Sequence, residues 1–180
     1  WAGLSPVNGA PQGYLNGAVS TNYAQLTGAA TQVSDLVYAG PSQPRYYGAL
    51  GNQLRYKGFT LALRATFRLG YVFKKDALDY GALFGTLDGH ADFAQRWQQP
   101  GDEQRTNVPA MIYPLVSSSA SFYKFSEVHV LKGDHVRLNY INLGYQLKPE
   151  WLKRLSLKQL QLNLSVQNLG ILWAANSEGI

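Results

Sequence analysis

Residues 59–71 read FTLALRATFRLGY, and this stretch decides the fold. Its odd-numbered positions are all apolar or aromatic, whereas the even-numbered positions include Thr60, Arg64 and Arg68. An alternation with a period of two is typical of a β-strand, because successive side chains point to opposite faces of a sheet. A helix would need apolar residues three and four positions apart, and that spacing scatters the aromatic residues. The sequence therefore predicts a strand with one apolar and one polar face.

This strand is expected to be the second half of a long hairpin. Two strands within Pro44–Phe73 are joined by the tight turn Tyr56-Lys57-Gly58-Phe59. From residue 59 to residue 71 the strand would be roughly 43 Å long at about 3.3 Å per residue, whereas strands of soluble proteins usually have about 5 or 6 residues. A tilted strand of that length can cross a bilayer, so the apolar face is expected to contact lipid.

The two arginines of this strand predict which face is turned to water. Each would cost about 2 to 4 kcal/mol if it faced lipid at the middle of the membrane, so both are expected to face the lumen of a barrel. In a further strand over residues 160–173, Gln161 and Asn163 alternate with leucines in the same way. The lumen-facing candidates are Arg64, Arg68, Gln161 and Asn163.

Another strand is expected over residues 136–147, and it changes the phase of its alternation once. Leu138 and Tyr140 share a face until Ile141 and the apolar residues after it take that face over. The strand over residues 160–173 reverses its phase near Asn168. A slip of one residue within a strand indicates a β-bulge, so each strand is expected to contain one.

The remaining segments are predicted to be mainly irregular. Residues 1–40 are rich in small and polar residues and suggest only a weak strand at 17–26. Residues 76–122 contain many glycines and prolines and end near the run Ser117–Ser119, so we expect one extended loop. Outer-membrane barrels carry such loops on their extracellular side. A proline followed by late basic residues predicts one or two helical turns at 149–155.

Composition excludes several classes of protein. The chain has no cysteine, which removes disulfide frameworks and thiolate metal sites, and no apolar run of about 18 residues that would predict a membrane-spanning helix. The formal net charge is +5, but the basic residues are scattered and no nucleic-acid-binding signature accompanies them, so no nucleic-acid partner is expected. Because the chain starts at Trp1 and its single methionine is Met111, we expect it to be part of a longer protein.

Several short motifs occur in order from residue 36 to the end of the chain. They are LVY at 36–38, GPSQP at 40–44, YGALGN at 47–52, YKGF at 56–59, RWQQPGDE at 96–103, VRL at 136–138, LGY at 143–145, QNL at 167–169 and GI at 179–180. In this order and spacing they resemble the C-terminal region of SusC/RagA-type TonB-dependent transporters. The alanine at position 49 departs from the paired glycines that are more usual there.

The resemblance implies an all-β fold: an antiparallel transmembrane β-barrel of about 22 strands, with long extracellular loops, in the bacterial outer membrane. Residues 1–180 would be the C-terminal portion of that barrel, with the plug domain and the last strand outside this chain. It implies a SusD-like surface lipoprotein and, through the missing N-terminal region, the TonB complex as partners. The implied function is import of large nutrients, glycans or oligopeptides, without a cofactor.

Candidate chemistry outside the barrel wall is sparse. By position in RWQQPGDE, the resemblance makes Arg96, Trp97 and Asp102 candidates for contact with a partner, although Trp97 could equally pin a Pro100-Gly101 turn. The ligand-type residues of Asp88–Asp92 favour a solvated loop over a metal site. His129 and His135 flank a segment that reads as a turn between strands.

Two other classes of protein stay open. A soluble surface β domain could bind glycans by stacking Trp97 and Tyr113 on sugar rings. An outer-membrane barrel enzyme would need an Asp/His or Ser/His site, and no such motif is recognised, so no catalytic residue and no enzyme activity are expected.

Overall fold

The computed structural model describes residues 1–180 except 30, 149, 151–156 and 179–180. The helical turns expected over 149–155 therefore lie outside the described residues. The chain divides into two compact units. The first unit comprises Trp1–Ala39 and Lys74–Leu131, and the second unit comprises Gly40–Phe73 and Lys132–Ile180. The short strands β6 (Val72–Lys74) and β7 (Val130–Lys132) pair in a two-stranded sheet where the chain passes from one unit to the other.

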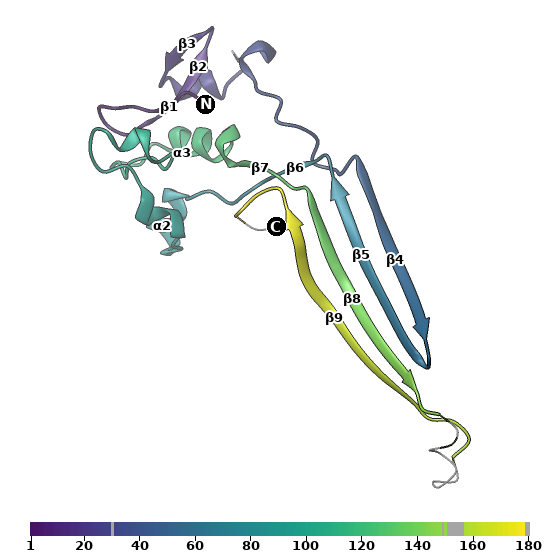
Figure 1. The fold of residues 1–180 in the computed structure, drawn as a ribbon. Coiled ribbons are helices and arrows are strands. Elements are labelled where there is room, and N and C mark those ends of the chain that lie inside the picture. The colour runs from purple at the N-terminus through teal and green to yellow at the C-terminus, as the bar shows by residue number, and fades with distance from the viewer. Residues whose placement is uncertain (30, 149, 151–156, 179–180) are drawn as a thin grey trace. The chain divides into compact units, whose positions relative to one another are not determined.

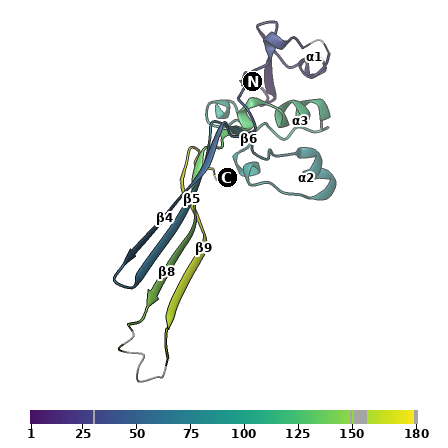
Figure 2. The same cartoon turned by 90° about the vertical axis from the view of Figure 1, so that its right-hand side faces the viewer.

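The second unit is a four-stranded antiparallel sheet in the order β4-β5-β8-β9. Its strands are β4 (Tyr46–Tyr56), β5 (Phe59–Leu69), β8 (His135–Gln146) and β9 (Gln161–Ala174). In Figures 1 and 2 they form one long, twisted layer. The predicted hairpin and both later strands are confirmed, and so is the antiparallel β architecture of this unit. The described strands form an open sheet, so closure into a barrel stays a prediction.

Local backbone chemistry sets the ends of the hairpin strands. Lys57 and Gly58 have positive φ angles of 46° and 89°, the combination that a two-residue type I′ turn requires. At the other end, β5 stops at Leu69 because Gly70 has a φ of 75°, which interrupts the extended backbone. The strand has 11 residues and does not continue to Tyr71 as the alternation predicted.

The strand register separates two faces. Leu61 of β5 lies opposite Leu54 of β4 and Leu143 of β8, and Leu143 in turn lies opposite Leu164 of β9. We call this side the apolar face. Several apolar side chains on it are exposed, with Leu50 at 71% and Leu164 at 60%, whereas Leu61 and Leu63 of the central strand β5 are half-buried. A sheet with such a face needs a further apolar layer or lipid against it.

The bulge of β8 lies one residue earlier than predicted. Its register with β5 jumps from Tyr140, opposite Arg64, to Leu138, opposite Ala65, so Asn139 is the extra residue. Leu138 therefore shares the apolar face with Ile141, and Tyr140 lies on the other face; the prediction that Leu138 and Tyr140 share a face was wrong. The predicted irregularity near Asn168 is confirmed, since β9 skips from Gln167 to Gly170 there.

The first unit is more ordered than the sequence predicted. In place of one weak strand at 17–26, it contains a small sheet, β1 (Gly3–Leu4), β2 (Pro11–Leu15) and β3 (Ala18–Ser20), followed by the helix α1 (Tyr23–Leu26). Its other elements are η1 (Val33–Asp35), α2 (Tyr80–Thr86), η2 (Ala91–Gln95), η3 (Asp102–Gln104), α3 (Ser117–Lys124) and η4 (Glu127–His129).

The prediction of one irregular loop over residues 76–122 was wrong. Leu78, Tyr80, Val108 and Tyr123 form a buried core cluster, and the serine run is the first turn of α3. The Asp79 carboxylate caps α2 by accepting hydrogen bonds from the backbone N–H groups of the next turn. None of the helices in the described part of the chain is long and apolar enough to cross a membrane.

Candidate functional site

The side of the sheet opposite the apolar face carries the hydrophilic residues and is called the polar face here. Its members, from the strand register, are Tyr47, Ala49, Gly51, Gln53, Arg55, Thr60, Ala62, Arg64, Thr66, Arg68, His135, Arg137, Tyr140, Asn142, Gly144, Gln146, Gln161, Asn163, Ser165, Gln167, Ile171 and Ala174. All four lumen-facing candidates, Arg64, Arg68, Gln161 and Asn163, lie on it. That this face lines a transport lumen stays a prediction.

A hollow of about 620 Å³ opens on the polar face around the β8 bulge. Arg64, Arg68 and Arg137 contribute to its lining together with His135 and Asn139. Arg137 is a site residue that the sequence analysis did not single out. Its part in the hollow follows from the pairing of β8 with β5, which one strand read alone does not reveal.

Two hydrogen bonds within the polar face join neutral side chains. The Ser165 hydroxyl donates to Asn142 Oδ1 at 2.6 Å, and Gln161 Nε2 donates to Asn163 Oδ1 at 3.0 Å. These amides and hydroxyls satisfy one another and keep the wall of the sheet hydrophilic between its charged positions.

The rim of the sheet, where β8 begins, is held by a carboxylate. Asp134 Oδ1 accepts hydrogen bonds from the backbone N–H groups of Gly70 at 2.7 Å and Tyr71 at 3.3 Å. The Tyr71 hydroxyl lies 3.2 Å from His135 Nδ1, which is also 2.8 Å from the carbonyl oxygen of Gly133. Between the two histidines, β7 ends at Lys132 and β8 begins at His135; Gly133 and Asp134 interrupt the strand there without forming the predicted turn.

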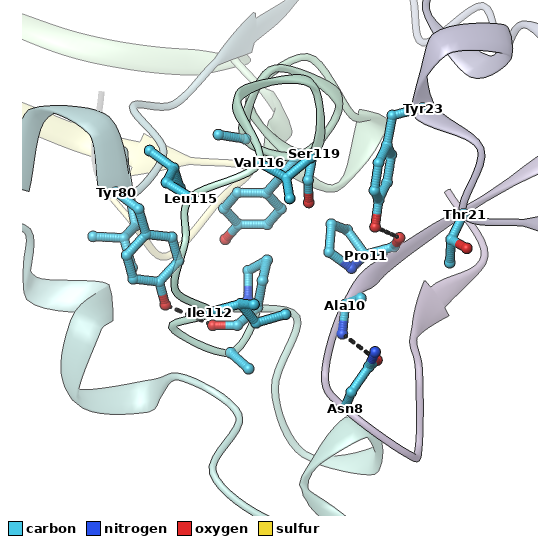
Figure 3. Close-up of a pocket in the computed structure, with 15 residues that line it drawn as sticks. Asn8, Ala10, Pro11, Thr21, Tyr23, Tyr80, Ile112, Leu115, Val116 and Ser119 are labelled. Carbon is cyan, nitrogen blue, oxygen red and sulfur yellow. Dashed lines mark hydrogen bonds between the residues drawn. The ribbon is translucent and has the colours of Figure 1, made fainter.

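The first unit contains a separate cavity of about 270 Å³, shown in Figure 3. Its lining is neutral and mostly apolar: Asn8, Ala10, Pro11, Thr21, Tyr23, Leu78, Tyr80, Pro109, Ala110, Ile112, Leu115, Val116, Ser119, Ala120 and Tyr123. Tyr80 donates its hydroxyl hydrogen to the carbonyl oxygen of Pro109 at 2.6 Å, and Tyr23 donates to that of Pro11 at 2.8 Å. Burial raises the pKa of Tyr80 to about 12, so it stays uncharged. Such a cavity suits a small uncharged, apolar group.

The loop residues predicted to contact a partner have structural partners within the first unit. The Trp97 side chain is 8% exposed, and its Nε1 donates to Glu103 Oε2 at 3.2 Å. Asp102 Oδ2 accepts hydrogen bonds from the backbone N–H groups of Gln98 and Gln99. Trp97 and Asp102 therefore stabilise the loop itself.

Arg96 is half-buried, as is Asp102, whereas Trp97 is buried. The Arg96 guanidinium lies over the ring of Phe93, 4.1 Å from the ring centroid, and one of its nitrogens donates to the Phe93 carbonyl oxygen. Contact of Arg96, Trp97 or Asp102 with a partner protein stays a prediction.

The segment Asp88–Asp92 is held by local contacts. His90 Nδ1 accepts a hydrogen bond from the backbone N–H of Asp92 and so caps η2. Among the residues that the structure describes, no group of three or more His, Cys, Asp or Glu side chains could hold a metal ion.

Comparison with known proteins finds a similarity to a TonB-dependent receptor. The chain is 26% identical over 149 residues to TonB-dependent receptor P3 of Formosa agariphila, a match that covers 82% of this chain and 14% of that protein. No family model matches the chain.

Among solved structures, the chain is similar to the RagAB peptide importer. The open-open state gives a TM-score of 0.62 at 14% identity and covers 96% of this chain and 18% of that one. The closed-closed state gives a TM-score of 0.58 at 17% identity and covers 96% and 19%. These structures share the fold of this chain.

The matches confirm the resemblance to SusC/RagA-type TonB-dependent transporters that the motifs indicated. TonB-dependent receptors are outer-membrane proteins, so the predicted location in the bacterial outer membrane is also confirmed. The chain spans 14% of the length of the curated relative it matches.

Proposed function

We propose that the chain is part of a TonB-dependent active transporter that imports large nutrients, glycans or oligopeptides, together with a SusD-like surface lipoprotein. The observation that carries this proposal is the sheet of the second unit. Its strands of 11 to 14 residues have one apolar face with exposed leucines and one polar face with arginines. The likeness to structures described as a peptide importer supports import as the activity.

The two-faced sheet is the arrangement that a barrel in lipid requires. Lipid offers no hydrogen bonds, so only apolar side chains are tolerated on the outer surface, while the inner surface is wet. A soluble glycan-binding domain would need a second layer over Leu50 and Leu164. An outer-membrane enzyme would need a catalytic constellation, whereas the matched proteins are receptors and transporters.

A pair of neighbouring substitutions in the intact transporter tests the orientation of the sheet. Leu63→Arg puts a charge on the apolar face, at a cost of about 2 to 4 kcal/mol in lipid. Ala62→Arg puts the same charge on the polar face one residue away. We expect the first variant to be missing from the outer-membrane fraction and the second to insert normally, as judged by fractionation and heat-modifiable gel mobility. Equal insertion of both variants would contradict the proposal that the apolar face contacts lipid in a barrel.

Energy coupling tests the transport activity itself. Cells that express the intact transporter and its lipoprotein should accumulate oligopeptides or oligosaccharides only when TonB is present and the inner membrane is energised. Uptake that is unchanged in a TonB-deficient strain contradicts active transport. A chain that stays soluble without detergent and binds glycans would instead support the soluble surface domain.

A further inference from the structure

The charge on the four-stranded sheet is all of one sign. Strands β4, β5, β8 and β9 contain four arginines, Arg55, Arg64, Arg68 and Arg137, and neither an aspartate nor a glutamate. Each arginine lies on the polar face. Because these strands contain no acidic residue, the polar face lacks a counter-charge of its own, and like charges on neighbouring strands repel one another.

Three of the four arginines are brought together by the register of β5 and β8. Arg137 lies directly opposite Thr66, which stands between Arg64 and Arg68 on the same face of β5. Arg137 is thus the diagonal neighbour of both, and diagonal pairs in an antiparallel sheet are about 7–8 Å apart. His135 lies directly opposite Arg68. We call Arg64, Arg68 and Arg137 the arginine triad; Arg55 lies apart from it, opposite Thr60 near the turn.

Asp134, the carboxylate next to β8 in the sequence, does not line the hollow. Asp134 uses Oδ1 to hold the backbone N–H groups of Gly70 and Tyr71. The hollow at the arginine triad is lined by neutral, basic and apolar residues alone. The triad thus opens into space large enough for a ligand, and nothing in its lining neutralises it.

We propose that the arginine triad binds carboxylate groups of the transported solute, an inference that rests on the proposed function and names a feature of its substrate. Guanidinium groups suit this ligand because they present parallel N–H donors that match a carboxylate bidentately. Acidic oligopeptides and uronic-acid oligosaccharides both display several carboxylates along a chain. A row of arginines on a lumen wall draws such solutes in by charge and holds them in register.

Binding to the intact transporter in lipid nanodiscs tests the proposal. Calorimetric titration uses four probes: triglutamate and triglutamine as a peptide pair, and trigalacturonate and maltotriose as a sugar pair. Within at least one pair, we expect the acidic probe to bind at least tenfold more tightly than its neutral partner. This preference should shrink as salt is raised from about 0.05 to 0.5 M, because added ions screen the charges.

Two matched sets of variants assign the effect to the triad. Replacing Arg64, Arg68 and Arg137 together by Gln should weaken binding of the acidic probe at least tenfold, and replacing them by Lys should weaken it less because the charge remains. Arg55→Gln, which removes one arginine of the same face outside the triad, should change affinity less than twofold. The Lys set also serves if the Gln set does not insert, since loss of bidentate geometry alone should still weaken binding.

Three results would overturn the proposal. The first is equal binding of acidic and neutral probes in both pairs, and the second is unchanged affinity for the acidic probe in the triad variants. The third is a loss of affinity in Arg55→Gln as large as that in the triad variants, which would mean that the overall positive charge of the face, and not the triad, attracts the probe. Energised uptake that persists with wild-type preference in the triad variants would also remove this inference while leaving the transporter function intact. Absence of TonB-dependent uptake by the wild-type protein would instead contradict the proposed transporter function.

Discussion

Among single residues, His129 has an unusual environment. Its side chain is 2% exposed, packs edge-on against the Tyr123 ring at a centroid distance of 4.5 Å, and has no hydrogen-bond partner for either ring nitrogen in the described structure. Burial first, and then the positive charge of Lys75, lower the pKa of His129 below its ordinary value. The core of the first unit therefore accommodates the neutral imidazole and disfavours the protonated one.

This environment predicts that the first unit loses stability in acid. Because the pKa of His129 is lower in the folded than in the unfolded state, the unfolded state binds the proton more readily. The stabilisation is complete above the unfolded pKa of about 6.5 and is lost as the pH falls through the lower folded value. Hydrogen exchange of peptides from residues 74–131, corrected for intrinsic rates, should show less protection at pH 5 than at pH 7.5.

His129→Phe is the matched control, since it keeps the aromatic contact with Tyr123 and removes the titrating group. Its protection should be nearly independent of pH over the same range. If wild type and variant respond to acid alike, another group is responsible for the loss.

Elements depend on backbone conformation at a few positions, and the β4–β5 turn is the clearest example. Gly58 has a φ of 89°, and a Cβ atom there would lie 2.9 Å from the carbonyl oxygen of Gln146. Gly58→Ala should lower the free energy of unfolding by about 1–2 kcal/mol, the cost of a left-handed backbone for a residue with a side chain. Urea unfolding of the intact protein measures this change.

Lys57→Asn tests the same turn in the opposite direction. Lys57 also has a positive φ, and asparagine adopts that conformation more readily than lysine does. Stability should stay the same or rise slightly. A loss comparable to that of Gly58→Ala would contradict the type I′ assignment.

The β8 bulge predicts the effect of removing one residue. Without Asn139, Leu138 and Tyr140 become adjacent opposite Ala65 and Arg64, so the alternation across the gap stays regular and no side chain changes face. The amount of heat-modifiable, folded protein in the outer membrane should therefore stay close to that of wild type. Asn139→Ala keeps the extra residue and should also fold like wild type, since the buried Oδ1 of Asn139 has no hydrogen-bond partner in the described residues. A several-fold loss of folded protein in the deletion alone would contradict this and show that the bulge itself is needed for folding.

The elements that sequence predicted well are those with a long repeat. Apolar and polar residues alternate over the full length of the strand at residues 59–69, so the pattern is strong. The turn at Lys57-Gly58 is recognisable because glycine favours the positive φ angle that the turn requires. The helices α2 and α3 have 7 and 8 residues, too short to establish an apolar stripe, and the glycines and serines within them read as loop. Their core depends on contacts between Leu78, Val108 and Tyr123, which are distant in sequence.

The site was predictable to the extent that one strand defines it. Alternation alone assigned Arg64 and Arg68 to the hydrophilic side. Arg137 was missed because its relation to them depends on the register across the bulge, which sequence periodicity placed one residue too late. The cavity of the first unit was missed for a similar reason, since its walls come from three separate segments.

At the scale of the whole molecule, two substitutions in the loop around Trp97 should distinguish an effect on folding from an effect on partner binding. Trp97 is buried, so Trp97→Ala should destabilise the first unit by about 3–5 kcal/mol, the usual cost of emptying a large aromatic site. Arg96→Ala removes a more accessible side chain and should cost about 1 kcal/mol or less. Thermal unfolding of the intact transporter compares the two.

The same pair of variants tests the proposed lipoprotein contact. Arg96→Ala should reduce co-purification of the SusD-like lipoprotein with the transporter at least several-fold while the transporter stays folded. If co-purification is unchanged in Arg96→Ala, this loop is not part of the contact, and the sequence resemblance at RWQQPGDE reflects folding alone.

In the described structure, β4 and β9 are the outermost strands of the four-stranded sheet, and each leaves one row of backbone amides and carbonyls unpaired. Such rows are templates on which a second copy of the strand can add. Before neighbouring strands pair with β4 and β9, a chain with apolar strands and unpaired edges is prone to aggregate with its own copies through backbone hydrogen bonds. In the proposed barrel, a chaperone would have to cover both edge strands until neighbouring strands pair with them.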